Sequence, residues 1–564
     1  MRSDSDKLLS VDNLEITFSQ HNIDTHAVKD ISFELSRGQS LGVVGESGSG
    51  KSVTSLAILR LLSASNSRVT GDIQFIDDLD LMDIQAATEK QLYSIRGRKI
   101  AMIFQEPMNT LNPVRTCGSQ VKEVLDVHKI GKKEDRKSRV LELFSQVQLP
   151  DVERIYRSYP HELSGGQLQR ISIAMAISTE PDILICDEPT TALDVTVQKE
   201  ILDLLRLVHS QNRMGMIFIS HDLDVVADIC DSVIVMYQGE IVEQGSLPET
   251  FLRPSHVYTK ALLLCKPTLD RKNEVLTTVS EVIDNPDYEV TQKVDYRVDR
   301  EQIQLKVENL QVYFPSKKDW PWSTSTYIKA VDGVSFDVYK GEILGIVGES
   351  GSGKSTLAKS IAGLIYPSSG SIFYAGRPIN SKILSRDKEL RKQLQLVFQD
   401  PYGSLNPQMT IGAAIREPLK YHNIVDRSAI YSKAASLLQE VGMDDSYMDR
   451  YPHQLSGGQR QRVCIARALT VEPHVLICDE SVSALDVSIQ AQILNLLDSL
   501  RRQRDLTILF ISHDLSVVHY LCDRMIVMQH GRIVESGKSE EIILSPKDTY
   551  TKKLIESIPS SIGT

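Results

Sequence analysis

The stretch GESGSGKS occurs at Gly45–Ser52 and again at Gly348–Ser355. Each copy follows a short run of apolar, mostly β-branched residues, LGVVG at Leu41–Gly45 and LGIVG at Leu344–Gly348, and precedes a stretch with a helical pattern. Runs of this kind are typical of a strand that is buried on both faces of a parallel sheet. A strand, a glycine-rich loop and a helix in this order predict a phosphate-binding loop. The sequence therefore predicts two of them, on an α/β fold.

The residue types of the loop suit a nucleotide. Its glycines let the backbone turn N–H groups inward around an anion, and the N-terminus of the helix adds its dipole. Lys51 and Lys354 are expected to reach the β- and γ-phosphates of ATP, and the hydroxyls of Ser52 and Ser355 to complete the ligand shell of Mg²⁺. The predicted nucleotide-binding residues of the loops are Gly45, Glu46, Ser47, Gly48, Ser49, Gly50, Lys51, Ser52, Gly348, Glu349, Ser350, Gly351, Ser352, Gly353, Lys354 and Ser355.

Two adjacent acids end each of two further apolar runs, ILICDE and VLICDE. At the carboxyl end of a parallel sheet such groups face the ligand crevice. The first acid of each pair, Asp187 or Asp479, is predicted to hold Mg²⁺. The second, Glu188 or Glu480, is predicted to orient or deprotonate the attacking water. A purely structural role is the alternative, but stability alone would disfavour two crowded carboxylates.

A histidine and a glutamine follow other apolar runs. His221 and His513 both stand 34 residues after the first acid, and we predict that they sense the γ-phosphate, although a lone histidine after a strand is more often structural. Gln105 and Gln399 are candidates to contact Mg²⁺ and the water. The predicted catalytic residues are thus Glu188, His221, Gln105, Glu480, His513 and Gln399, and the predicted metal ligands are Ser52, Gln105, Asp187, Ser355, Gln399 and Asp479.

The sequence contains an internal duplication of one unit. Gln167 and Gln459, like His221 and His513, are separated by 292 residues. The other repeated stretches are LSGGQ at Leu163–Gln167 and Leu455–Gln459, ALDV at Ala192–Val195 and Ala484–Val487, and FISHDL at Phe218–Leu223 and Phe510–Leu515. A duplication of this kind predicts two domains of the same fold.

The predicted domains are residues 8–265 and 304–564, joined by a polar, charge-mixed tether at 266–303 without helical periodicity. Each copy ends in a similar stretch, HVYTKALL at His256–Leu263 and DTYTKKLI at Asp548–Ile555, which predicts a short closing helix. Trp320 and Trp322 lie in an extra loop of the second copy and are expected at the tip of a hairpin.

Composition narrows the possible partners. The net charge of -11 disfavours a duplex nucleic acid, which requires a basic face. The seven cysteines form no CxxC pair or zinc-like cluster, so we expect buried thiols in a reducing cytosol. No secretory signal is recognised at the start, and no run of 18 apolar residues occurs anywhere. Any role at a membrane is therefore expected to need a partner.

Together these motifs resemble the ATP-binding cassette (ABC) superfamily over nearly the whole chain, and LSGGQ discriminates it from other phosphate-loop ATPases. The resemblance implies two tandem cassettes, each a RecA-like α/β core with an antiparallel β subdomain and a helical signature subdomain. It also implies ATPase activity with ATP and Mg²⁺, at sites shared between the cassettes. Each site would join the catalytic residues of one half to the signature of the other, that is Ser456, Gly457, Gly458 and Gln459 for the first site and Ser164, Gly165, Gly166 and Gln167 for the second.

Two aromatic residues have a weaker assignment. Phe18 and Phe314, in the matching contexts NLEITF and NLQVYF, resemble the adenine-stacking residue of the family. The alternative is that either of them belongs to the core.

Within the superfamily, the chain is most similar to the ATPases of oligopeptide and dipeptide importers, through FQEPMNTLNP, YPHELSGGQ and ALDVTVQ and their second copies. The two halves resemble two subunits that are normally separate. Ser481 departs from the proline that is commoner in the family and stands at 189 in the first copy, and we expect a small effect. Some members carry an iron–sulfur cluster near the tail; the tails here offer only Cys265, so none is expected.

The resemblance implies the energy-coupling subunit of an importer for peptides or similar small solutes, on the cytoplasmic face of the inner membrane. Its partners would be two membrane permeases, which provide the only membrane contact, and an extracytoplasmic solute-binding protein, with no direct nucleic acid contact. One alternative is a soluble twin-cassette ATPase that acts on the ribosome or on nucleic acid; such proteins usually have a long charged helical linker. Another is an exporter ATPase. The transported solute is left open.

Overall fold

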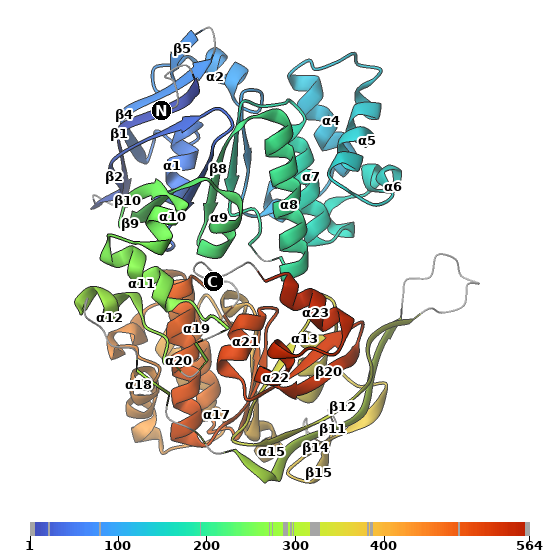
Figure 1. Cartoon of the computed structure of the whole chain (residues 1–564). Coiled ribbons are helices and arrows are strands. Elements are labelled where there is room, and N and C mark those ends of the chain that lie inside the picture. Colours follow the sequence, from blue (N-terminus) through green and yellow to red (C-terminus); the bar gives the residue numbers. More distant parts are fainter. Residues whose placement is uncertain are drawn as a thin grey trace.

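The computed structural model describes residues 6–20, 23–77, 80–191, 193–269, 271–272, 274–285, 291–293, 296, 298–315, 327–380, 383, 387–482 and 485–558. The two copies of the sequence form two halves that pack against each other, the first above the second in Figure 1. Within the ranges that are described, no helix is long and apolar enough to cross a membrane.

Each half is built on a mostly parallel sheet whose last strand in the chain is antiparallel to its neighbour. Every residue of the phosphate-loop strand, β3 (Ser40–Val44) or β13 (Ile343–Val347), is buried, as the apolar runs predict. In the first half the strand order is β10 (Glu240–Ser246), β9 (Ser232–Tyr237), β3 (Ser40–Val44), β8 (Gly215–Ser220), β7 (Ile183–Asp187) and β6 (Ile100–Ile103). In the second it is β20 (Arg532–Lys538), β19 (Arg524–Gln529), β13 (Ile343–Val347), β18 (Thr507–Ile511), β17 (Val475–Asp479) and β16 (Leu394–Val397).

An antiparallel sheet packs on each core sheet. In the first half its order is β2 (Ile23–Ser36), β1 (Lys7–Gln20), β4 (Ser67–Asp77) and β5 (Asp80–Asp83). In the second it is β12 (Tyr327–Lys340), β11 (Asp299–Pro315), β14 (Ser369–Tyr374) and β15 (Arg377–Ile379). The predicted fold, two α/β cassettes each with an antiparallel β subdomain, is confirmed.

The helices complete each half. In the first they are α1 (Lys51–Ile58), α2 (Glu89–Ile95), α3 (Pro107–Thr110), α4 (Cys117–Val127), α5 (Arg136–Gln146), α6 (Val152–Arg157), α7 (Gly165–Ile177), α8 (Val195–Asn212), α9 (Leu223–Ile229), α10 (Leu247–Leu252) and α11 (Val257–Cys265). In the second they are α13 (Lys354–Ile361), α15 (Lys388–Gln393), α16 (Pro401–Ser404), α17 (Ile411–Tyr421), α18 (Ile430–Glu440), α19 (Gly457–Leu469), α20 (Val487–Arg504), α21 (Leu515–Leu521), α22 (Ser539–Leu544) and α23 (Thr549–Glu556). The helices α4 to α7 and α17 to α19 form a helical arm beside each core, and α11 and α23 are the predicted closing helices.

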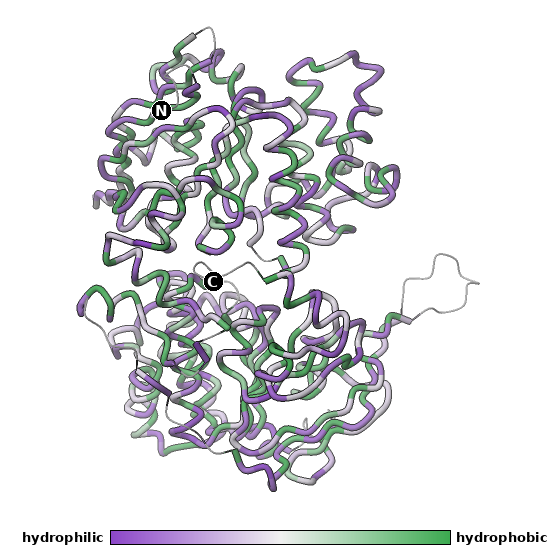
Figure 2. The backbone as a smooth tube through the Cα atoms, viewed as in Figure 1, coloured by the Kyte–Doolittle hydropathy of each residue, from purple (hydrophilic) through white to green (hydrophobic). Residues whose placement is uncertain are grey.

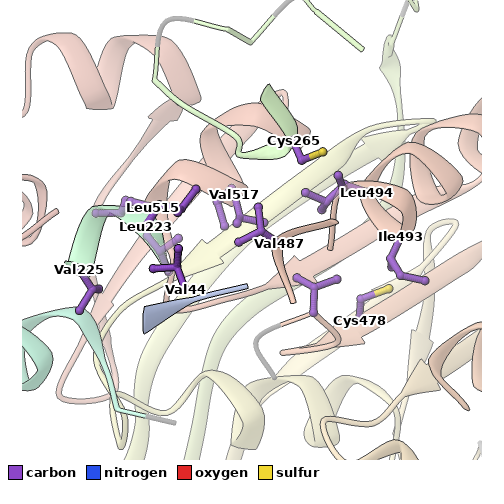
Figure 3. Packing of buried hydrophobic residues seen from close by; sticks show 14 of the residues in the cluster. Val44, Leu223, Val225, Cys265, Cys478, Val487, Ile493, Leu494, Leu515 and Val517 are labelled. Atoms are coloured by element: carbon purple, nitrogen blue, oxygen red, sulfur yellow. The ribbon is translucent and has the colours of Figure 1, made fainter. Parts of the chain in front are cut away.

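One hydrophobic core cluster spans both halves, and each half has a further cluster of its own. A single cluster of buried residues contains Val44, Leu223 and Val225 of the first half and Val487 and Leu515 of the second. Figure 3 shows these side chains converging from both halves, and Figure 2 shows apolar segments running through the interior of each half. The first half also bonds directly to the second, because Lys199 on α8 donates a hydrogen bond of 2.8 Å to the carbonyl of Glu556 on α23. The halves are therefore packed together as one body.

The linker differs from the predicted tether. Its described part contains a helix, α12 (Val279–Asp284), and Leu276, Val279 and Val282 are buried in the shared core. The expectation of a stretch without helix was wrong: Val279, Val282 and Ile283 stand at i, i+3 and i+4, a helical spacing, but a helix of six residues is too short for this spacing to stand out in the sequence. Trp320 and Trp322 lie outside the described residues.

Candidate functional site

The two phosphate-binding loops have the backbone that their glycines predict. Gly45 and Gly50 have φ values of 152° and 104°, and Gly348 and Gly353 have 151° and 103°. These values lie in the region that side chains disfavour. A Cβ atom on Gly50 would also lie 2.7 Å from the carbonyl oxygen of Ala27, so the loop could not close against β2. Each loop leads into a helix that begins at the lysine.

The lysine of each loop is buried and points back into the loop. Lys51 Nζ donates to the carbonyl oxygens of Gly45 and Glu46 at 2.7 and 2.8 Å. Lys354 Nζ makes the same two bonds in the second half, also at 2.7 and 2.8 Å. Burial lowers the pKa of both lysines, and nearby carboxylates, Glu188 for the first and Glu480 for the second, oppose the shift. An ammonium group held in this way can pair with phosphate oxygens at the mouth of the loop.

A hydroxyl and a carboxylate meet directly behind each loop. Ser52 Oγ donates to Asp187 Oδ1 at 2.9 Å, and Ser355 Oγ donates to Asp479 Oδ1 at 2.9 Å. Burial raises the pKa of both aspartates, and the hydrogen bond from the serine opposes this shift. Oxygen ligands of these two kinds are those that Mg²⁺ prefers, and a divalent cation would compensate the buried charge. The pairs therefore fit a magnesium ion bound with the nucleotide.

The other predicted catalytic residues of the first half, Gln105 and His221, both contact Glu188. Its carboxylate accepts hydrogen bonds from Gln105 Nε2 at 2.8 Å and Thr191 Oγ1 at 2.9 Å, and its Oε1 lies 3.3 Å from His221 Nδ1. Burial raises the pKa of Glu188, but the hydrogen bond and charge of His221 outweigh this and hold the pKa at about 2. The group is thus ionised at neutral pH and can accept a hydrogen bond from a water molecule.

The second half repeats the arrangement less tightly. Gln399 Nε2 donates to Glu480 Oε2 at 2.7 Å, whereas His513 Nδ1 lies 3.8 Å from the same oxygen. Both glutamates adopt a left-handed backbone, with φ of 47° at Glu188 and 46° at Glu480. Such strain in a residue other than glycine costs about 1–3 kcal/mol and is concentrated at functional sites.

The signature stretches open the helices α7 and α19. Ser164 caps α7 in a reciprocal capping box with Gln167, and Ser456 caps α19 in the same way with Gln459. The second glycine of each signature allows a close approach to the next helix, because a Cβ atom on Gly458 would lie 2.2 Å from Ile489 Cγ2. Both signatures therefore present a helix N-terminus, which is a binding site for anions.

Each phosphate-binding loop contacts the opposite half. The backbone N–H of Ser47 donates to Asp486 Oδ1 at 3.1 Å, and that of Ser350 donates to Asp194 Oδ2 at 3.4 Å. A cavity of about 130 Å³ lies between the halves, and both His221 and His513 line it. Sequence reasoning did not select the two aspartates as site residues, although the repeated ALDV contained them. Contacts of this kind bring the two loops to one interface.

Two tyrosines of the closing helices also belong to the loops. Tyr258 Oη accepts a hydrogen bond of 3.0 Å from the backbone N–H of Glu46, and Tyr550 Oη accepts one of 3.0 Å from that of Glu349. Tyr258 is fully buried, and burial raises its pKa, so it is a neutral phenol. Sequence reasoning missed this role; the only signal was the YTK shared by the two tails.

Replacing Tyr258 by phenylalanine is expected to lower the free energy of unfolding by about 1–3 kcal/mol, because the N–H of Glu46 loses its partner. Urea denaturation measures this difference. Tyr237→Phe is the matched control, since its ring packs 4.2 Å from that of Tyr258 while its hydroxyl only accepts an exposed bond from Gln238. An equal decrease in the free energy of unfolding for the two variants would show that the hydrogen bond between Tyr258 and Glu46 does not stabilise the protein.

The two predicted adenine-stacking residues have different surroundings. Phe18 on β1 is half-buried and packs against the core of the first half. Phe314 on β11 is 39% exposed. A stacking role therefore stays a prediction for both residues, and Phe314 is the more accessible one.

Known proteins are similar to this chain in sequence. Residues 28–191 and 331–483 match the family described as ABC transporter, and residues 242–287 and 534–562 match the one described as Oligopeptide/dipeptide transporter, C-terminal region. The glutathione import ATP-binding proteins GsiA of Escherichia coli O157:H7 and Salmonella paratyphi A are each 43% identical over 566 residues, 99% of this chain and 90% of the relative. A solved dimeric ATP-binding cassette, MJ0796, is 26% identical with a TM-score of 0.37 and covers 42% of this chain and 98% of its own.

Proposed function

The chain belongs to the ABC transporter family and is a transport ATPase, and from this premise we propose that it powers the import of peptides or similar small solutes. The observation that supports the proposal most is the bonding of each phosphate-binding loop to the opposite half, through Asp486 and Asp194, in a chain with two intact sets of motifs. The match of both tails to the oligopeptide/dipeptide transporter C-terminal region favours an importer of peptide-like solutes. Glutathione, the solute for which the GsiA relatives are named, is a member of this class.

We propose two composite ATP sites at the interface. In the first, Lys51 binds the phosphates, Ser52 and Asp187 hold Mg²⁺, and the signature of the second half closes the site. Glu188 orients the attacking water, and His221 and Gln105 hold the carboxylate of Glu188 in place. Mg²⁺, when bound, would neutralise charge on the phosphates. The second site uses the corresponding residues, with the signature of the first half.

The proposed cycle follows from this geometry. ATP between a loop and the opposite signature would draw the halves together, since each half supplies only part of the anion site. Hydrolysis and release of phosphate would remove the shared ligand and let them part. Such a movement of rigid bodies around a ligand can be transmitted to other subunits.

A groove beside Gln399 suits a permease helix. In the second half a cavity of about 430 Å³ is lined by Phe398, Tyr421 and Arg467, among others. Phe398 and Tyr421 are 41% and 59% exposed, so the groove presents aromatic surface to solvent. We propose that a cytoplasmic helix of a permease lies here, next to the residue that contacts Glu480. The chain would then lie on the cytoplasmic face of the inner membrane, with a second permease on the first half and a solute-binding protein outside.

The alternative of a twin-cassette ATPase without permeases is disfavoured. The linker helix α12 has only six residues, whereas proteins of that kind usually carry a long charged helical linker. The net charge of -11 also opposes binding to nucleic acid.

A pull-down separates the two functions. Tagged protein with Glu188→Gln and Glu480→Gln, mixed with detergent-solubilised membranes and ATP, is expected to recover two multi-span permeases, because bound ATP would hold the halves together. Mass spectrometry identifies the recovered proteins. The control is the Lys51→Ala/Lys354→Ala protein, in which nucleotide-dependent recovery should be lost. Recovery of ribosomes or nucleic acid without a membrane protein would overturn the proposed transport role.

A further inference from the structure

The linker begins with a partly buried cation beside the first proposed ATP site. Lys266 directly follows α11, and its side chain is only 19% exposed. Its ammonium lies 2.5 Å from Asp222 Oδ1 and 2.6 Å from Asp224 Oδ2. Burial lowers the pKa of Lys266, but the two carboxylates outweigh this and raise it above its usual value, so the group is charged. Lys266 therefore ties the linker to the residues that follow His221.

These two aspartates belong to the turn that carries His221. The N–H of Asp222 donates to Ser220 Oγ at 3.0 Å, and Asp222 Oδ1 accepts from the N–H of Asp224 at 3.0 Å, which caps α9. His221 stands between the two ends of this turn. An anchor on Asp222 and Asp224 therefore restricts where the imidazole of His221 can lie.

The second copy lacks this anchor. At the offset of 292 that relates His221 to His513, Lys266 corresponds to Ile558 and Asp224 to Ser516, while Asp222 corresponds to Asp514. Ile558 and Ser516 line the same interface cavity as Lys266. In the described part of the chain Asp514 makes no ion pair, and its carboxylate only caps α21 by accepting from the N–H groups of Ser516 and Val517. Two of the three charges of the anchor, those of Lys266 and Asp224, are thus absent from the second copy.

The histidines differ as this difference predicts. His221 Nδ1 lies 3.3 Å from Glu188 Oε1, a distance at which a hydrogen bond can form, whereas His513 Nδ1 lies 3.8 Å from Glu480 Oε2. The linker is itself held firmly, because the carbonyl of Leu269 lies 3.1 Å from His519 Nε2 on α21. Cys265, the residue before Lys266, lies beside Leu494 of α20 in Figure 3. The residues on both sides of Lys266 thus contact the second half, whereas its ammonium group pairs with Asp222 and Asp224 of the first half.

We infer that Lys266 is a positioning residue of the first ATP site, which holds the turn of His221 against Glu188 and makes the first site hydrolyse ATP faster than the second. The inference rests on the two ATP sites proposed above. Because His221 is already held against Glu188, it needs no reorganisation during the reaction. In the second site, His513 would have to move into the same position at each turnover. A difference of the size of one hydrogen bond corresponds to about 3–10-fold in rate.

The test measures each site separately. The protein is incubated with 8-azido-ATP, Mg²⁺ and orthovanadate, which traps the product at a site that has hydrolysed the nucleotide, and is then irradiated. Mass spectrometry of the peptides assigns the label to the half of Lys51 or the half of Lys354. We expect about 3–10-fold more label in the first half of the parent protein after a short incubation.

Matched variants exchange the anchor between the copies. Lys266→Ile with Asp224→Ser gives the first copy the residues of the second and avoids leaving the buried Asp224 carboxylate unpaired; it is expected to equalise the halves. Lys266→Arg, which keeps the charge, should retain most of the difference. Ser516→Asp with Ile558→Lys is expected to raise the label of the second half.

Thermal unfolding and equilibrium ATP binding confirm that each variant is folded. An unchanged ratio of label in the Lys266→Ile/Asp224→Ser protein, or an equal loss in both halves, would overturn the inference and leave the proposed sites intact. A parent protein that hydrolyses ATP but is labelled equally in both halves would overturn it too. A parent protein that traps no nucleotide in either half would instead contradict the ATP sites themselves.

Discussion

With Glu188 and Glu480 both replaced by glutamine, the protein is expected to bind ATP normally and to hydrolyse it slower by roughly 10²–10⁴. Each carboxylate lies at the end of the strand behind its loop and accepts a hydrogen bond from Gln105 or Gln399. The amide of glutamine keeps the size of the side chain but removes the charge that orients and activates water. The loop lysines, which would bind the phosphates, are not altered.

Steady-state release of phosphate measures the rate, and equilibrium titration measures the binding of ATP. The control is Glu89→Gln with Glu389→Gln, which makes the same chemical change at two exposed glutamates in the first turns of α2 and α15. Its turnover should equal that of the parent protein. Normal turnover in the Glu188→Gln/Glu480→Gln protein would show that another group activates the water.

The second large effect is expected from Lys51→Ala with Lys354→Ala, which should weaken ATP binding by about 100-fold. Hydrogen bonds from a charged group contribute about 1.5–3 kcal/mol each, and alanine removes all those that the ammonium would make to the phosphates. The loop is built around this cation, because its carbonyls at Gly45 and Glu46 already point toward Lys51.

Isothermal titration with ATP and Mg²⁺ measures the change, and thermal unfolding supplies the control. Alanine removes the cost of burying the ammonium, which lowers the pKa of both lysines, and also removes its hydrogen bonds to the loop carbonyls. Because these two effects oppose each other, the midpoint without nucleotide should change little. The rise of the midpoint on adding ATP should be lost, since a ligand stabilises only as far as it binds. A variant that keeps the affinity of the parent for ATP would contradict the role given to these lysines.

The sequence alone was sufficient to predict the fold, the phosphate-binding loop of each half and the acidic residues beside it. Motifs such as GESGSGKS predict local structure because a strand, a tight glycine turn and a helix follow from neighbouring residues and from the burial of apolar runs. The meeting of Ser52 with Asp187 was predictable too, since both stand at the carboxyl edge of one sheet. The duplication then predicted the second site.

Only the tertiary structure showed which residues contact the phosphate-binding loops from distant parts of the chain. Tyr258 bonds to a loop 212 residues earlier in the chain, and Asp486 to one 439 residues earlier. The order in the linker and the anchor of Lys266 on Asp222 also depend on surfaces that meet after folding. Such contacts carry no periodicity or spacing along the chain, because each depends on how two finished halves pack. The contacts from which we infer that the two proposed sites differ therefore became visible only when both halves were in place.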